Sequence, residues 1–161
     1  MNTLLLERRR LLALKLAAIA QLAGHLRYSR QRLPYPLASV DALAPEALES
    51  VSALIERFGK LQDLLGNAMR EVIVLSGEDA TDMNAVLSRM EKLGLLDSAD
   101  DWRALRALRN QAAHDYDLAD DRKTAFVNAL AARTDMLLTT ASRMEHYAKK
   151  TFGLADDLAQ A

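Results

Sequence analysis

The sequence predicts an all-α fold, an up-and-down bundle of four to five helices that forms one domain over residues 1–161. Leu and Ala dominate the composition, whereas only 5% of the residues are aromatic, and Leu and Ala lose little entropy in a helix. Apolar residues recur at helical spacing over long segments, and no segment alternates as a strand does. Most predicted connections are short, which favours antiparallel packing of neighbouring helices.

The first predicted helix runs from about Thr3 to Arg30, because its apolar residues recur every seven positions. The segment 33–36 holds two prolines, which lack an amide donor and bias the preceding residue away from helix. We therefore expect a connection over 31–44. The predicted apolar positions of the helix are Leu5, Leu12, Ile19 and Leu26, with Leu16 and Leu22 or Ala23 between them.

The second predicted helix begins at Pro45, since proline is tolerated in a first helical turn, and ends near Ser76 and Gly77. The heptad spacing of both helices predicts either internal packing or a dimer seam, because periodicity does not say which surface is the partner. We favour internal packing. The repeating positions are Val51, Phe58, Leu65 and Val72, accompanied by Leu54, Leu61, Ala68 and Leu75.

Three further helices are expected in the second half of the chain. Asp82 is suited to cap a short third helix, and Gly94 to close it in a left-handed conformation. Ser98 resembles the start of a capping box and opens a fourth helix. Asp120 or Asp121 starts the last helix, which we expect to reach about Lys150 and to leave a frayed tail over 151–161. The predicted apolar positions are Met83, Val86 or Leu87, Met90 and Leu93; then Trp102, Leu105, Leu108 and Ala112; then Phe126, Leu130, Leu137, Met144 and Tyr147.

Composition and charge exclude several classes of protein. A chain that is 50% hydrophobic and 27% charged is typical of globular rather than disordered proteins. The net charge of −1 lacks the basic footprint of proteins that coat nucleic acid, so any RNA contact must be local. The absence of cysteine excludes disulfides and thiolate metal sites, and three histidines leave few other metal options. We expect a cytoplasmic protein that needs no metal.

The N-terminal segment is apolar but does not resemble a targeting signal. Arg8, Arg9, Arg10 and Lys15 interrupt it, and no small-residue cleavage site follows. No apolar run of about 18 residues without charge occurs, so no membrane span is expected. The arginine run is interpreted as a solvated face, with contact to RNA or a partner as the alternative.

One segment, residues 106–117, carries more polar residues than packing requires, and it lies at the end of the fourth predicted helix. On an ideal helix Asn110 and His114 are four residues apart and share a face, whereas Arg109 lies about 140° round the axis from His114. Arg109 and His114 therefore flank a groove. The long guanidinium can close that gap within one chain, or the two groups can meet across a dimer axis.

These residue types suit cleavage of an RNA phosphodiester by its own 2′-hydroxyl. Histidine takes or gives a proton near neutral pH, and a guanidinium holds two phosphate oxygens as charge builds. Asn110 could orient the phosphate or His114, and Tyr116 could bind phosphate or base, or present its hydroxyl for modification. Arg103 and Arg106 precede Arg109 along roughly one side of the helix and would supply a local basic strip.

Each of these residues also has a purely structural interpretation. Arg and Asn at a helix end often act as solvated or capping groups, and a histidine there is stabilised by the helix dipole. His25 and His146 stand alone on long helices and are interpreted as surface or packing residues. Trp102 is interpreted as a core anchor rather than a platform for stacked bases.

The spacing Arg109, four residues, His114, one residue, Tyr116 resembles the motif of the HEPN superfamily, and more narrowly that of its HepT-like members. The Arg-Asn opening, the place at the end of a late helix after a tryptophan, and the all-helical chain fit this resemblance. It covers about Val51 to Lys150, whereas residues 1–44 match only in being helical.

The resemblance implies a HEPN-like bundle and a metal-independent endoribonuclease toxin of a toxin–antitoxin pair, acting as a homodimer with two facing motifs. It implies that Arg109 and His114 are catalytic. It also implies a partner, an MntA-like minimal nucleotidyltransferase antitoxin, which transfers AMP to Tyr116. The added charge and bulk would then compete with RNA beside the catalytic pair.

Two other functions remain open. The chain could be a non-catalytic subunit that binds a substrate or nucleotide for a small nucleotidyltransferase. It could also be a plain helical dimerisation module. Ribonuclease activity, nucleotide binding near Arg109, or no effect of changing the three motif residues would separate these hypotheses.

Overall fold

The computed structural model describes residues 3–115 and 119–154, with backbone alone for 111–115. Within these residues the chain forms five helices and no strand, which confirms the predicted all-α class. The helices are α1 (Thr3–Gln31), α2 (Pro45–Leu75), α3 (Met83–Lys92), α4 (Ala99–Asp115) and α5 (Asp120–Phe152).

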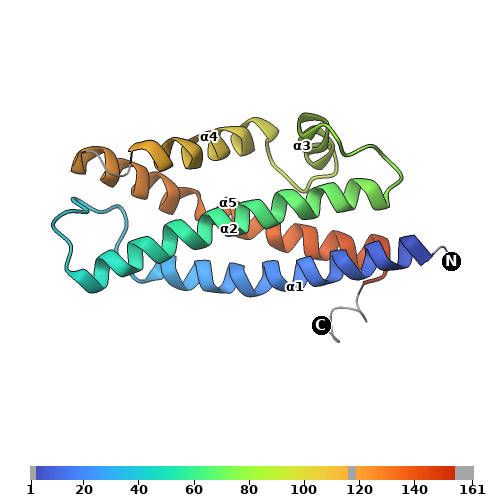
Figure 1. Cartoon of the computed structure of the whole chain (residues 1–161), viewed down its shortest axis with the longest axis horizontal. Coiled ribbons are helices and arrows are strands. Elements are labelled where there is room, and N and C mark those ends of the chain that lie inside the picture. The colour runs from blue at the N-terminus through green and yellow to red at the C-terminus, as the bar shows by residue number, and fades with distance from the viewer. Residues whose placement is uncertain (1–2, 116–118, 155–161) are drawn as a thin grey trace.

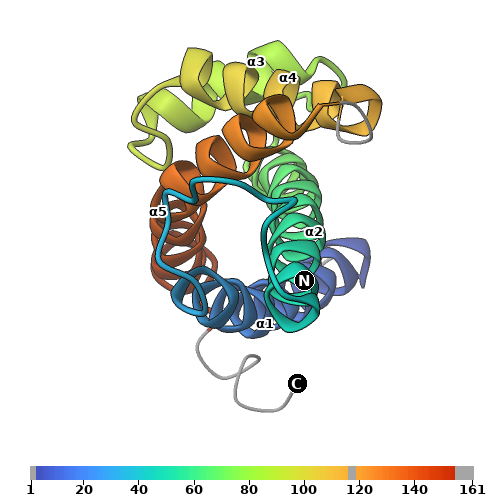
Figure 2. The ribbon, with the colours of Figure 1, turned by 90° about the vertical axis from the view of Figure 1, so that its left-hand side faces the viewer.

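The four longer helices run alternately in opposite directions, as expected for an up-and-down bundle (Figure 1). Seen from one end, α1, α2 and α5 surround a common centre, and α3 and α4 lie together at the top of the view (Figure 2). The helix α1 packs against α2 and α5, α4 packs against α5, and α3 packs against α2 and α4. The end of α4 and the start of α5 lie at the same end of the bundle as the connection between α1 and α2 (Figure 1).

Side chains from all five helices meet in one apolar core. The heptad residues of α2 that were open to two interpretations, Val51, Phe58, Leu65 and Val72, are fully buried within the chain. They form internal packing and not a dimer seam. Trp102 is 1% exposed and acts as the core anchor of α4, as predicted.

Local capping explains where α3 and α4 begin. A carboxylate oxygen of Asp82 accepts a 2.9 Å hydrogen bond from the amide of Asn84 at the start of α3. The hydroxyl of Ser98 accepts one of 3.1 Å from the amide of Asp101 at the start of α4. Gly94 has a φ of 72°, the left-handed conformation expected after α3.

Two expectations are wrong at the ends of the chain. Leu5 is 43% exposed rather than buried, because no other described helix covers the first turn of α1, where Leu4 and Leu6 are exposed as well. Within the tail expected to fray over 151–161, α5 continues to Phe152 and Leu154 is fully buried, whereas 155–161 lie outside the described residues. Gly153 ends the helix with a φ of 65° and turns the chain back, which brings Leu154 into the core.

None of the described helices is long and apolar enough to cross a membrane.

Candidate functional site

The candidate motif occupies the last turns of α4. Arg109 and Asn110 are described with their side chains, and α4 remains helical through His114 and Asp115. The side chain of His114 and the whole of Tyr116 lie outside the described residues. Because the helix is continuous, positions 109 and 114 are separated by about 140° round its axis.

Arg109 is held against the neighbouring helix α2. One terminal guanidinium nitrogen lies 2.5 Å from Oδ1 of Asp63, and the other lies 2.9 Å from Oδ2. This is the bidentate fork geometry in which a guanidinium and a carboxylate match best. The side chains of Arg109 and Asp63 remain 32% and 47% exposed, so the pair is accessible at the surface.

A glycine in the middle of α2 makes room for this arginine. Gly59 is buried one turn before Asp63, and a Cβ atom added to it would lie 2.9 Å from Nε of Arg109. Real Cβ atoms essentially never approach another heavy atom that closely. Gly59 and Asp63 thus form a seat for the guanidinium, which we call the Arg109 seat.

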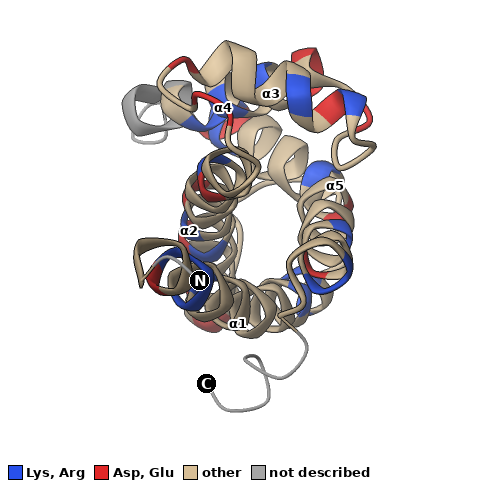
Figure 3. Cartoon of the chain, turned by 90° about the vertical axis from the view of Figure 1, so that its right-hand side faces the viewer, with Lys and Arg blue, Asp and Glu red and all other residues tan. Residues whose placement is uncertain are grey.

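The neighbouring arginines differ in their surroundings. Arg103 donates to Asn84 at 2.9 Å and forms an ion pair with Asp100 at 2.6 Å. Arg106 is exposed and has no ion-pair partner among the residues that the structure describes. Acidic side chains therefore lie beside two of the three arginines of the expected basic strip. Basic and acidic residues are also mixed along α3 and α4 (Figure 3).

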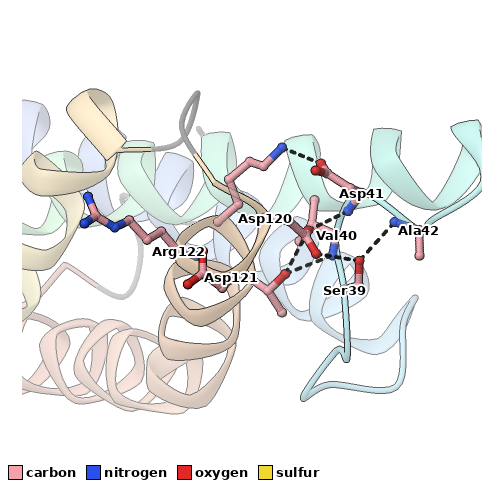
Figure 4. A network of polar contacts seen from close by, with 9 residues as sticks. Ser39, Val40, Asp41, Ala42, Asp120, Asp121 and Arg122 are labelled. Carbon is pink, nitrogen blue, oxygen red and sulfur yellow. Dashed lines mark hydrogen bonds and ion pairs between the residues drawn. The ribbon is translucent and has the colours of Figure 1, made fainter.

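Beyond the motif, the start of α5 is fastened to the connection between α1 and α2 (Figure 4). The carboxylate of Asp120 accepts hydrogen bonds from the Ser39 hydroxyl at 2.7 Å and from the Asp41 amide at 2.8 Å. Thr124 accepts from the Val40 amide at 2.9 Å, one turn further along α5. Lys123 also forms an ion pair with Asp41.

A third turn of α5 continues this contact. The side-chain amide of Asn128 accepts a 2.7 Å hydrogen bond from the Leu37 amide and donates one of 2.8 Å to the Leu37 carbonyl. Asp120, Thr124 and Asn128 are spaced by four residues and so lie on one helix face. We call these three residues the α5 clamp. The described backbone is thus anchored on both sides of 116–118.

The hydrogen bonds of the α5 clamp also change the pKa of Asp120. The Asp41 amide, followed by the Ser39 hydroxyl, lowers the pKa of Asp120 below its ordinary value of 3.8, because both groups donate to its charged carboxylate.

The N-terminal basic segment and the two other histidines lie on α1 and α5 rather than on α4. Arg8 and Lys15 form ion pairs of 3.2 and 3.3 Å with Glu71, so part of the N-terminal basic segment binds α2. A guanidinium nitrogen of Arg9 lies 3.6 Å from the position that a Cβ atom added to Gly153 would take. His25 and His146 are exposed. No group of three or more His, Cys, Asp or Glu residues in the described part could hold a metal ion.

Sequence reasoning missed the Arg109 seat and the α5 clamp. A glycine inside a long predicted helix was the available signal for the seat, because it is less favourable there than alanine and so suggests a close approach. The four-residue spacing of Asp120, Thr124 and Asn128 was the signal for the clamp. Neither signal names the partner, since Asp63 and Arg109 are 46 residues apart in the chain.

Comparisons with protein-family models, curated proteins and solved structures found no match to this chain.

Proposed function

We propose that this protein is a metal-independent endoribonuclease toxin of the HEPN, HepT-like kind. The observation that carries this proposal is a guanidinium that is both fixed and accessible. Arg109 is held by two hydrogen bonds yet is 32% exposed, on the same helix as the position of His114. A preorganised cation at the surface is suited to bind a phosphate whose charge increases during the reaction.

In the proposed reaction the 2′-oxygen of a ribose attacks the adjacent phosphorus and loses its proton to a base. The bond from phosphorus to the 5′-oxygen of the next nucleotide breaks, and that oxygen takes up a proton. The products are a 2′,3′-cyclic phosphate and a free 5′-hydroxyl. His114 carries out proton transfer, and Arg109 binds the non-bridging phosphate oxygens. Asn110 and Arg106, both exposed on α4, together with Arg103, contact the rest of the RNA.

A second copy of the chain completes the site in this proposal. Arg109 is directed toward α2 by the Arg109 seat, whereas position 114 lies about 140° round α4. A two-fold axis can bring Arg109 of one copy near His114 of the other, which explains how two groups on different faces of one helix act on one phosphate.

Regulation would act through Tyr116, two residues after His114. An MntA-like nucleotidyltransferase transfers AMP from ATP to the tyrosine hydroxyl and releases pyrophosphate. The added phosphate is an anion that competes with RNA for Arg109, and its nucleoside blocks access. Intact mass after co-expression with such a partner would show the added AMP, and Tyr116→Phe would abolish that addition.

The test of the activity itself uses the purified chain without a partner, single-stranded RNA of mixed sequence, and EDTA. We expect cleavage by the wild type and a loss of about 100-fold or more in His114→Ala and Arg109→Ala, because proton transfer and charge stabilisation each contribute at least that much. His146→Ala is the matched control, since His146 is an exposed histidine on another helix. It should cleave as the wild type does.

RNA left intact by the wild type, or cut equally well by His114→Ala, would contradict the proposal. If nucleotide binding that depends on Arg109 accompanied such a result, the chain would instead be a nucleotide-binding subunit.

A mixing experiment tests the shared site. Equal amounts of Arg109→Ala and His114→Ala are unfolded, mixed and refolded together. Half of the dimers would be mixed, and each mixed dimer would contain one site with both side chains, so about a quarter of wild-type activity should return. No recovery would show that each chain uses its own arginine and histidine.

A further inference from the structure

We infer that Gly59 and Asp63, which form the Arg109 seat, are positioning residues that hold the Arg109 guanidinium ready for a phosphodiester. Because this role presupposes the ribonuclease activity proposed above, the experiment below includes a measurement that does not need cleavage. Neither residue touches RNA in this scheme, and both act through Arg109.

The atoms that lie closest to Gly59 belong to Arg109. The three nearest atoms to an added Cβ are all in its guanidinium group, Nε at 2.9 Å, Cζ at 3.3 Å and a terminal nitrogen at 3.4 Å. At Gly24 on α1, by contrast, nothing lies within 4 Å of an added Cβ. Glycine is less favourable than alanine within a helix. The glycine at position 59 therefore lowers the stability of α2 at the place where the Arg109 side chain packs against it.

Asp63 prevents the guanidinium from rotating. It uses both of its oxygens and binds both terminal nitrogens, whereas a single hydrogen bond would leave the group free to turn. A guanidinium has five N–H groups, and the carboxylate takes two of them. The carboxylate therefore leaves N–H groups that can bind phosphate oxygens, and a third of the side chain is exposed to solvent.

Stability alone does not explain this arrangement. Both partners of the ion pair are at least 32% exposed, and surface pairs of this kind contribute little to folding. A fixed arginine is more valuable for binding, because less rotamer freedom is lost when the phosphate arrives and the group already lies where charge develops.

The decisive variant is Gly59→Ala, with Gly24→Ala as its matched control. The control should raise the melting temperature by ~2–4 °C, because alanine is the better helix residue, and should keep the wild-type kcat. Gly59→Ala should melt within a few degrees of the wild type. Its kcat for RNA should fall on the order of 10- to 100-fold, because the methyl group displaces the guanidinium.

Asp63→Asn shows whether Asp63 positions the Arg109 guanidinium or competes with RNA for it. If Asp63 positions Arg109, kcat falls about 10-fold or more and KM changes little, and Asp63→Glu, which keeps the carboxylate, recovers part of kcat. If Asp63 instead competes with RNA, Asp63→Asn lowers KM and keeps or raises kcat. That second result would overturn the inference.

Nuclear magnetic resonance of the Arg109 side chain gives a measurement independent of cleavage. Rotation about the Nε–Cζ bond should be slow in the wild type and in Gly24→Ala, and fast in Gly59→Ala and Asp63→Asn. Slow rotation in all four proteins would overturn the inference even if RNA is cut. If the wild type cuts no RNA but the rotation rates differ as expected, the proposed activity fails while the positioning of Arg109 stands.

Discussion

Arg109 illustrates what a single residue shows in sequence and in structure. Its type and its distance from His114 suggest phosphate chemistry, but they do not show which surface it faces. In the structure it lies over Gly59 and binds Asp63 with both terminal nitrogens. The roles of Arg109, His114 and Tyr116 in a reaction remain predictions, whereas the seat of the guanidinium is a feature of the fold.

The residue before Asp63 is buried at an energetic cost. Gln62 is 0% exposed, and neither polar atom of its side-chain amide has a hydrogen-bond partner among the residues that the structure describes. Burying an amide without partners costs about 1–3 kcal/mol. Gln62→Met keeps a similar volume and removes the polar group, so it should raise the free energy of unfolding by about 1–3 kcal/mol.

Urea denaturation followed by circular dichroism measures this change. Gln21→Met is the control at an exposed glutamine on α1, where the effect should stay within about 0.5 kcal/mol. A less stable Gln62→Met variant would mean that the amide is hydrogen-bonded in solution.

Among the elements, α5 shows how a helix can fasten a segment without regular structure. The connection between α1 and α2 presents its backbone amides and the Ser39 hydroxyl to the α5 clamp over three successive turns. Prolines predicted that this segment leaves the helix, but they carry no information about where it binds. The partners are 79 to 91 residues apart in sequence, and the packing of α1 against α5 brings them together.

The carboxylate of Asp120 makes this contact dependent on pH. Its pKa in the folded chain is lowered, chiefly by the Asp41 amide, so its charged form stabilises the fold above the unfolded value of about 3.8. This contribution is present at neutral pH and is lost as the pH falls through the lower, folded pKa. As the pH falls below the lowered pKa of Asp120, we expect the contact between residues 39–42 and α5 to weaken before the helices unfold.

Hydrogen exchange of the Asp41 amide between pH 3 and 7 tests this expectation, once corrected for the intrinsic rate. Protection should fall at the acid end in the wild type. In Asp120→Asn it should be weaker at neutral pH and should lack the acid step. Equal profiles in both proteins would show that Asp120 does not control the contact.

At the scale of the whole molecule, the single core couples α4 to the rest of the bundle. Trp102 is the largest of the fully buried side chains, and it lies seven residues before Arg109 on the same helix. Trp102→Ala should lower the free energy of unfolding by about 3–5 kcal/mol, because it removes a large apolar side chain and leaves a cavity.

Circular dichroism is the suitable signal, since Trp102 is the only tryptophan. Tyr28→Ala is the control, because Tyr28 is 59% exposed, and it should change stability by less than about 0.5 kcal/mol. A loss below about 1 kcal/mol in Trp102→Ala would mean that α4 is not part of the common core.

The sequence by itself determined the helical class, the starts of the last four helices and most of the core positions. These features depend on local properties such as helical periodicity, capping side chains and prolines, which act within a few residues. The sequence also singled out Arg109, His114 and Tyr116 as a candidate site, although their chemistry is still to be tested.

Only the tertiary structure decided what the candidate site is built against. The Arg109 seat on α2, the α5 clamp, and the burial of Leu154 each join segments that are far apart in the chain. The exposure of Leu5 has the same origin, since an apolar residue is buried only where another surface covers it. Contacts between helices depend on how whole faces pack together, and a pattern within one helix does not specify its neighbour.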